Sequence, residues 1–123
     1  MQHVLYVGQD PTTVDFSDPS LPPGMDAGKI QAGIDKAAQA LTARGWDART
    51  CMITPDDAGI AVLTHQLESA SYACVVIGGG LRIPKTLRLF EQIINAIHRH
   101  APQAAIAFNT SPDDTAEAAA RWL

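Results

Sequence analysis

The chain has 123 residues, of which 46% are hydrophobic and 18% are charged, values typical of a folded globular domain and not of a disordered chain. We expect one domain over residues 1–123, large enough to bury a core without disulfides or a metal. The net charge is −4 and no basic stripe is present, which argues against a nucleic-acid partner.

The first ten residues, MQHVLYVGQD, lack the basic region of a signal peptide and resemble a first strand. The apolar runs are much shorter than the roughly 18 residues that a membrane span needs. We therefore expect a cytoplasmic protein with no membrane partner. Cys51 and Cys74 have no C-x-x-C spacing and are expected to be reduced core thiols.

Strand and helix patterns alternate along the first half of the chain. HVLYVG (3–8) is a strand, a long loop covers 9–26, and a helix is predicted over about 27–44. The apolar residues that share one face of this helix are Ile30, Ile34, Ala37 and Leu41. WDARTCMI (46–53) is a second strand. The next helix is expected to begin with Thr54 as its cap.

The second half continues the alternation. YACVVIG (72–78) is a continuous apolar run, typical of a strand covered on both faces. A helix is predicted over about 84–100, and AAIAFN (104–109) is a fourth strand. Ser111 then caps a last helix.

This order predicts the fold class α/β, because strands joined by helices pair in parallel through right-handed crossovers. We expect a three-layer α/β/α sandwich around a four-stranded parallel sheet of order 2-1-3-4. It would be a small Rossmann-like relative of the flavodoxin-like arrangement. In such sheets ligands bind beyond the carboxyl ends of the strands, here between the first and third.

Three glycines and two cations follow the third strand: Gly78, Gly79, Gly80, Arg82 and Lys85. Glycines let the backbone approach a ligand, and a helix N-terminus beyond them would supply free N–H groups. The cations complement a phosphate or carboxylate. The alternative is a tight turn followed by solvated cations, since the spacing matches neither G-x-G-x-x-G nor the Walker A motif.

The loop after the first strand carries the whole charge imbalance, because residues 1–26 contain four Asp and no Lys or Arg. Its length is typical of a functional loop, and Asp10, Thr12 and Thr13 are candidate ligand contacts. Two alternatives stay open for Asp10 and Asp15. They would bind a hard cation, or they would pair with the cations after the glycines and close the crevice.

Asn109 is a further ligand candidate at the end of the fourth strand, the alternative being a turn residue before the Ser111 cap. No metal site is predicted, because His98 and His100 do not share a helix face. No cofactor is predicted either: QDPTTVDFSD lacks the glycine of the flavodoxin phosphate loop, so flavin binding has no support.

The helix over 84–100 has a wider apolar face than one sheet contact requires. Its apolar residues are Leu87, Leu89, Phe90, Ile93, Ile94 and Ile97. We therefore expect a homodimer formed through this helix, a fully buried helix being the alternative. Two functions remain: a domain that binds a small anionic metabolite, with no general base evident, or a non-catalytic dimeric scaffold with a closed crevice.

Overall fold

The computed structural model describes all residues, 1–123, and contains one parallel sheet of order β2-β1-β3-β4. The strands are β1 (His3–Gln9), β2 (Asp47–Ile53), β3 (Tyr72–Ile77) and β4 (Ala105–Phe108). The helices are α1 (Ala27–Ala43), α2 (Asp57–Glu68), α3 (Leu87–His100) and α4 (Thr115–Ala120). The predicted fold class and strand order are confirmed.

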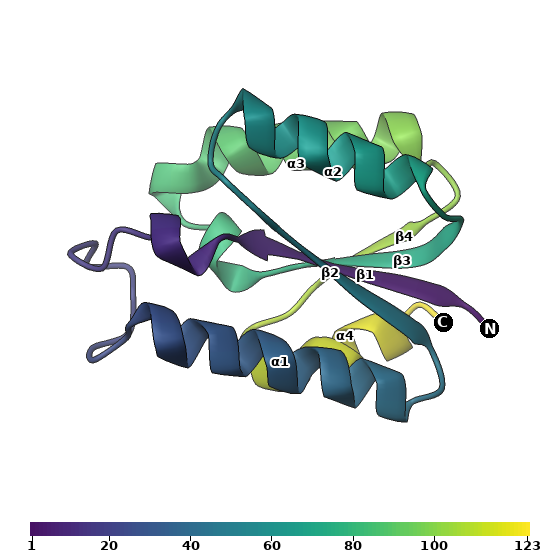
Figure 1. Cartoon of the computed structure of the whole chain (residues 1–123), viewed down its shortest axis with the longest axis horizontal. Coiled ribbons are helices and arrows are strands. Elements are labelled where there is room, and N and C mark those ends of the chain that lie inside the picture. The colour runs from purple at the N-terminus through teal and green to yellow at the C-terminus, as the bar shows by residue number, and fades with distance from the viewer.

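Helices cover both faces of the sheet (Figure 1). α1 and α4 pack on one face and α2 and α3 on the other, which divides the core into two clusters. The α1 side includes Tyr6, Ile34 and Leu41; the α2/α3 side includes Leu63 and Ile93. β1 and β3 supply side chains to both clusters, which explains why β3 is apolar throughout.

Three helix starts differ from the prediction. The N-cap of α2 is Asp56 and not Thr54: the Asp56 carboxylate accepts the Gly59 N–H at 2.9 Å and the Thr54 hydroxyl at 2.6 Å. α3 begins at Leu87, because residues Pro84–Thr86 form a separate 3-10 turn. Ser111 is a cap, but of the 3-10 turn Pro112–Asp114 ahead of α4 and not of α4 itself, whose N-cap is Asp114.

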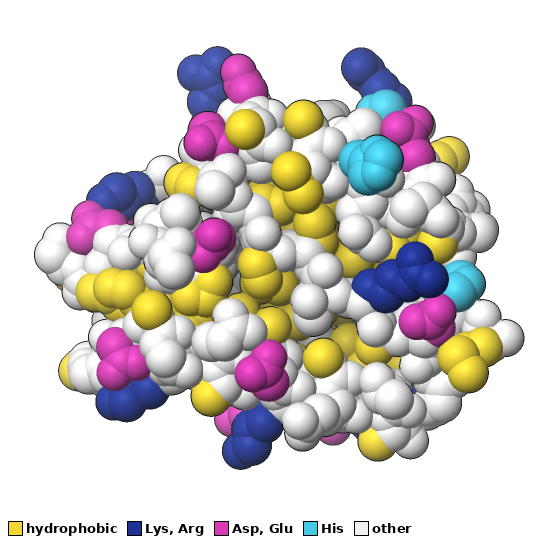
Figure 2. Space-filling view, in the orientation of Figure 1, with side chains coloured by type: hydrophobic (Ala, Val, Ile, Leu, Met, Phe, Trp, Pro, Cys, Tyr) yellow, Lys and Arg dark blue, Asp and Glu magenta, His cyan; other side chains and the backbone are white.

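The face that presents β2, nearest the viewer in Figure 1, has an apolar middle and a charged rim. Figure 2 shows hydrophobic side chains in a band between the two helical layers, with most Lys and Arg side chains near the periphery. The band reaches the end of the molecule where the loops after β1 and β3 lie. This is the end at which the sequence predicts a site.

Cys51 and Cys74 are both free and buried. Burial raises the pKa of each thiol to about 11, so both stay neutral core groups. None of the helices combines the length and the apolar character required to cross a bilayer.

Candidate functional site

A crevice of about 470 Å³ opens at the carboxyl ends of β1 and β3. The two strand ends are joined there by the Gly78 N–H, which donates to the Val7 carbonyl at 2.8 Å. The crevice walls come from β1, the end of β2, the loop after β1, α1, the glycine loop that follows β3 and the turn before α4. The structure therefore brings together the segments that the sequence placed at one sheet edge.

Most of the crevice wall is apolar. The apolar residues that line it are Val14, Leu21, Pro22, Met25, Ile30, Ile34, Met52, Leu81, Ile83 and Pro112. The polar side chains that line it are those of Tyr6, Gln9, Ser20, Lys29, Arg82, Thr110 and Ser111. A predominantly apolar pocket with a few polar groups is typical of small-molecule sites. The loop prolines and methionines in this wall were not among the predicted site residues.

Gly78, Gly79 and Gly80 line the crevice, but they do not make a left-handed turn. The only glycines with positive φ are Gly24 and Gly45. A Cβ at Gly80 would meet no atom within 4 Å, and one at Gly79 would lie 3.6 Å from Arg82 Nη2 and from the Thr110 carbonyl oxygen. The missing side chains therefore leave space in the crevice instead of relieving backbone strain.

The glycines also do not lead directly into α3. They open a 3-10 turn, Gly79–Leu81, and a second short turn separates it from the helix. The helix N-terminus that the sequence pattern placed beside the glycines is therefore displaced, because Pro84 begins its own turn. The N–H groups of the first turn of α3 are not part of the crevice wall.

Arg82 lies across the ends of two strands. Its Nη1 donates to the Ile77 carbonyl at 2.5 Å, and its Nη2 donates to the Asn109 carbonyl. The guanidinium carbon lies 5.2 Å from the centroid of the Phe108 ring, within cation–π range. Burial lowers the pKa of Arg82, although the group stays charged at any ordinary pH. Arg82 thus clamps β3 to β4 while lining the crevice.

Lys85 is not part of the crevice wall. Its ammonium forms an ion pair with Asp15 of the loop after β1. The hydrogen bond from Lys85 holds the pKa of Asp15 well below its usual range, and the same contact raises the pKa of Lys85. One of the ion pairs considered for the acidic loop is therefore present, whereas Arg82 bonds to backbone carbonyls.

Asp10, Thr12 and Thr13 form a local capping network, and none of them lines the crevice. The Asp10 carboxylate accepts the Thr12 N–H at 2.9 Å and its hydroxyl at 2.8 Å. Bonding to the Thr12 N–H lowers the pKa of Asp10. The Thr13 hydroxyl donates to the Asp10 carbonyl at 2.7 Å. Asp10 thus bonds to Thr12 and Asp15 to Lys85, so the two carboxylates have separate partners. Nowhere in the protein do three or more His, Cys, Asp or Glu side chains lie close enough together to hold a metal ion.

Asn109 is buried behind the crevice, with 1% of its surface exposed. Its Nδ2 donates to the Thr115 hydroxyl at 2.9 Å and to the Tyr6 hydroxyl at 3.3 Å. Tyr6 itself lines the crevice, and burial raises its pKa, so the phenol stays protonated. Tyr6 was not among the predicted site residues, because an aromatic residue in an apolar strand has the pattern of a core residue. The one available signal was its hydroxyl, which needs a polar partner when buried.

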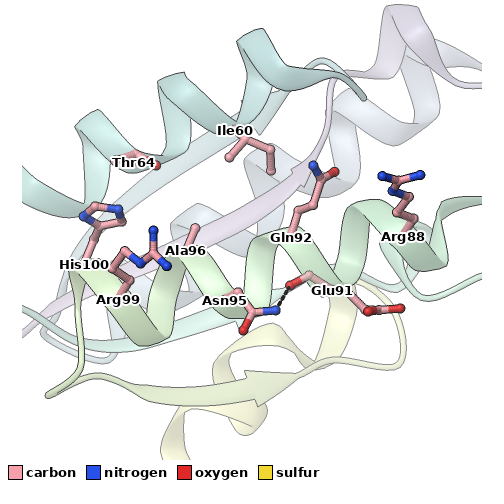
Figure 3. A pocket seen from close by; sticks show the side chains of 9 residues that line it. All are labelled: Ile60, Thr64, Arg88, Glu91, Gln92, Asn95, Ala96, Arg99 and His100. Atoms are coloured by element: carbon pink, nitrogen blue, oxygen red, sulfur yellow. Dashed lines mark hydrogen bonds between the residues drawn. The ribbon is translucent and has the colours of Figure 1, made fainter.

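A second hollow, of about 480 Å³, lies between α2 and α3. Figure 3 shows Ile60 and Thr64 on the α2 side and a row of long polar side chains on α3, with Arg88 and Arg99 toward opposite ends. The Asn95 amide bonds back to the Glu91 carbonyl of its own helix at 2.9 Å. This groove is a helix–helix surface lined mainly by α3.

The predicted dimer face of α3 is largely used within the chain. Leu89, Ile93 and Ile97 are buried against the sheet, and Phe90 and Ile94 pack partly against the same cluster. Leu87 remains 54% exposed. The apolar face is wide because α3 packs against both the sheet and α2.

No protein-family model matches the sequence, and comparison with curated proteins gives no match either.

Proposed function

We propose that this protein binds a small ligand with an anionic group, phosphorylated or carboxylated, in the crevice at the ends of β1 and β3. The observation that carries the proposal is the crevice itself: about 470 Å³ of space at the edge of a parallel sheet where ligands usually bind. Its volume lies in the range of small-molecule sites.

The chemistry of the crevice supports a ligand with both apolar and polar parts. The walls contributed by α1 and the loop after β1 are mainly apolar, while Arg82 and the Tyr6 hydroxyl lie on the strand side. Arg82 has five N–H donors, and each of its terminal nitrogens makes one bond to a carbonyl. The remaining donors are available for an acceptor oxygen of the ligand.

The proposal is tested by titrating ¹⁵N-labelled protein with phosphate, sugar phosphates, nucleotides and small carboxylates while following backbone amide shifts. We expect saturable shifts at Gly78–Arg82 and Thr110 for at least one compound. Gly79→Val should remove them, because its methyl groups would enter the space between Arg82 and Thr110.

The matched control is Asn95→Leu, which adds apolar bulk to the groove between α2 and α3 and should leave binding unchanged. The spectrum of each free variant verifies that it is folded. The proposal fails if no compound produces saturable shifts. It fails equally if the shifts persist unaltered in Gly79→Val.

A second function, a homodimeric scaffold, is favoured by the exposed edge of β4. This strand, AIAF, carries no charged side chain, and Phe108 is 43% exposed beside Phe90, their ring centroids 5.5 Å apart. Unprotected edges pair readily with other strands. A second copy could add its own β4 antiparallel about a two-fold axis. Arg121 shields only the Phe108 carbonyl, at 3.0 Å.

Sedimentation of the wild-type chain and of Phe108→Lys tests this alternative. A dimer that becomes monomeric in the variant would support it. A wild-type monomer at high micromolar concentration would exclude it.

A further inference from the structure

We propose that the Tyr6 hydroxyl donates a hydrogen bond to an acceptor oxygen of the crevice ligand, and that this ligand is a carboxylate on an apolar body. The inference rests on the proposed function and specifies the ligand class of the same site. Its basis is a chain of hydrogen bonds behind the crevice in which the Tyr6 oxygen accepts a bond from Asn109, so that its proton is directed away from the amide.

The chain begins at Thr115, which is fully buried. Its hydroxyl donates to the Pro112 carbonyl at 2.8 Å, so its single proton is used and the oxygen can only accept further bonds. The side-chain amide of Asn109 lies 2.9 Å from that oxygen. Asn109 must therefore turn its NH₂ group, and not its carbonyl, toward Thr115.

The same NH₂ group faces Tyr6. Asn109 Nδ2 lies 3.3 Å from the Tyr6 hydroxyl oxygen, and since the nitrogen is a donor, the phenol oxygen accepts this bond. The Tyr6 proton consequently points away from Asn109. The Thr115 hydroxyl, whose oxygen already accepts the Asn109 N–H, lies beside the phenol, so an acceptor in the crevice competes with Thr115 for this proton. The orientation has a cost, because Asn109 Oδ1 is left buried without a hydrogen-bond partner. Thr115 thus fixes the amide, and the amide fixes the phenol.

Tyr6 is only 4% exposed, and the part of it that remains accessible lines the crevice. Its neighbour Gly78 keeps the phenol uncovered: a Cβ on Gly78 would lie 3.5 Å from the hydroxyl oxygen. An acceptor in the crevice can bond to the O–H at little cost, because the phenol is already held in place.

The cations of the crevice favour a carboxylate over a phosphate dianion. Both terminal nitrogens of Arg82 already donate to carbonyls, and the Lys29 ammonium donates to the Gly24 carbonyl at 2.6 Å. The rest of the lining, which includes Ile30, Ile34 and Met52, is mainly apolar. Tyr6 and the remaining Arg82 donors suffice for one carboxylate, while a dianion would leave oxygens against apolar surface.

The test compares wild type with Tyr6→Phe, using phenylacetate and hexanoate as carboxylates and inorganic phosphate and glucose 6-phosphate as comparison compounds. Amide shifts report both the site and the dissociation constant. We expect the carboxylates to bind in the crevice and the loss of one hydrogen bond to a charged group to weaken them about 10- to 100-fold. The phosphates should bind more weakly than the carboxylates.

Thr115 supplies a second pair of variants that does not alter any crevice side chain. Thr115→Val frees the Asn109 amide to rotate, so that its carbonyl takes the Tyr6 proton, and carboxylate affinity should fall. Thr115→Ser keeps the hydroxyl and should restore the affinity, which identifies Thr115 as a positioning residue. This pair decides the question if Tyr6→Phe does not fold.

The outcomes separate the two proposals. Crevice binding of carboxylates with unchanged affinity in Tyr6→Phe or Thr115→Val overturns this inference and leaves the proposed function intact. Crevice binding by phosphates in preference to carboxylates does the same. Absence of binding by every compound overturns both.

Discussion

Two hollows of the protein have almost equal volumes, about 480 Å³ between α2 and α3 and about 470 Å³ at the ends of β1 and β3. Their walls differ. The groove between the helices is lined mainly by long polar side chains of α3, displayed in Figure 3. The crevice is lined by several separate segments and includes four glycines and a buried tyrosine.

Because the two hollows have almost the same volume, volume alone does not identify a ligand site. Long side chains such as those of Arg88, Gln92 and Arg99 can fill a groove by changing rotamer, since exposed rotamers interconvert readily. A wall of glycine backbone cannot fill its own space, and the position of Tyr6 is held by hydrogen bonds to a buried amide. The crevice is therefore the more preorganised of the two, and preorganisation is what favours binding.

The largest expected change in stability comes from a glycine of α2, one of the two helices that form the groove. A Cβ on Gly59 would lie 1.9 Å from the Thr54 carbonyl oxygen, so Gly59→Ala must displace the start of α2. We expect the free energy of unfolding to fall by about 3 kcal/mol, as in overpacked cores. Chemical denaturation measures this loss.

The matched variant is Gly80→Ala in the crevice, where the added Cβ meets no atom within 4 Å and φ is not positive. We expect unchanged stability or a gain of about 0.4–1 kcal/mol, because alanine reduces the entropy of the unfolded chain. A substantial loss in Gly80→Ala would mean that the crevice glycines serve the backbone and not the open space.

A smaller difference in stability is expected between variants of two arginines, Arg82 in the crevice and Arg88 in the groove. Arg82→Met removes the bonds to the Ile77 and Asn109 carbonyls and should lower the free energy of unfolding by about 2 kcal/mol. Arg88→Met, in the groove, should change it by less than about 0.5 kcal/mol, typical of surface positions. Thermal and urea unfolding of both variants measure the difference. Equal losses would contradict the role of Arg82 as a clamp.

The architecture followed from local patterns, and much of the site did not. Apolar periodicity and the rules for parallel connections predict the layers and the strand order, because each depends on residues close in sequence. The Asp15–Lys85 pair joins residues 70 positions apart, and the sequence offered it only as one of two open alternatives. The Tyr6–Asn109 bond joins residues 103 apart and was not anticipated. Such contacts depend on how side chains pack after the fold forms, which no local spacing encodes.

The glycine run illustrates the same limit. Its composition predicts a backbone that approaches a ligand, and the residues do line the crevice. The sequence does not distinguish glycine used for positive φ from glycine used to leave space, since both have the same residue type. Only the backbone angles and the neighbours of each absent Cβ separate the two roles.

The smallest expected effect concerns the loop that closes one side of the crevice. The lowered pKa of Asp15 means that the ion pair with Lys85 favours the charged carboxylate, so its contribution is complete above the ordinary Asp pKa of about 3.9. It is lost as the pH falls below that value. We expect the Ser17 and Lys85 amide shifts to stay constant from pH 7 through the ordinary Asp range and to move only well below it, because shifts of the folded protein follow the lowered pKa of Asp15.

Asp15→Asn should remove that transition and make the loop amides exchange faster at neutral pH, with little change in global stability, because exposed ion pairs contribute little. Glu68→Gln is the matched control at the groove, where Glu68 lies 3.4 Å from His100, and it should leave the loop unchanged. If Asp15→Asn kept both the loop exchange rates and the acid transition, the loop would be held by its apolar contacts alone. Leu21, Pro22 and Met25 line the crevice, so the crevice would then depend on apolar packing for its wall and not on charge.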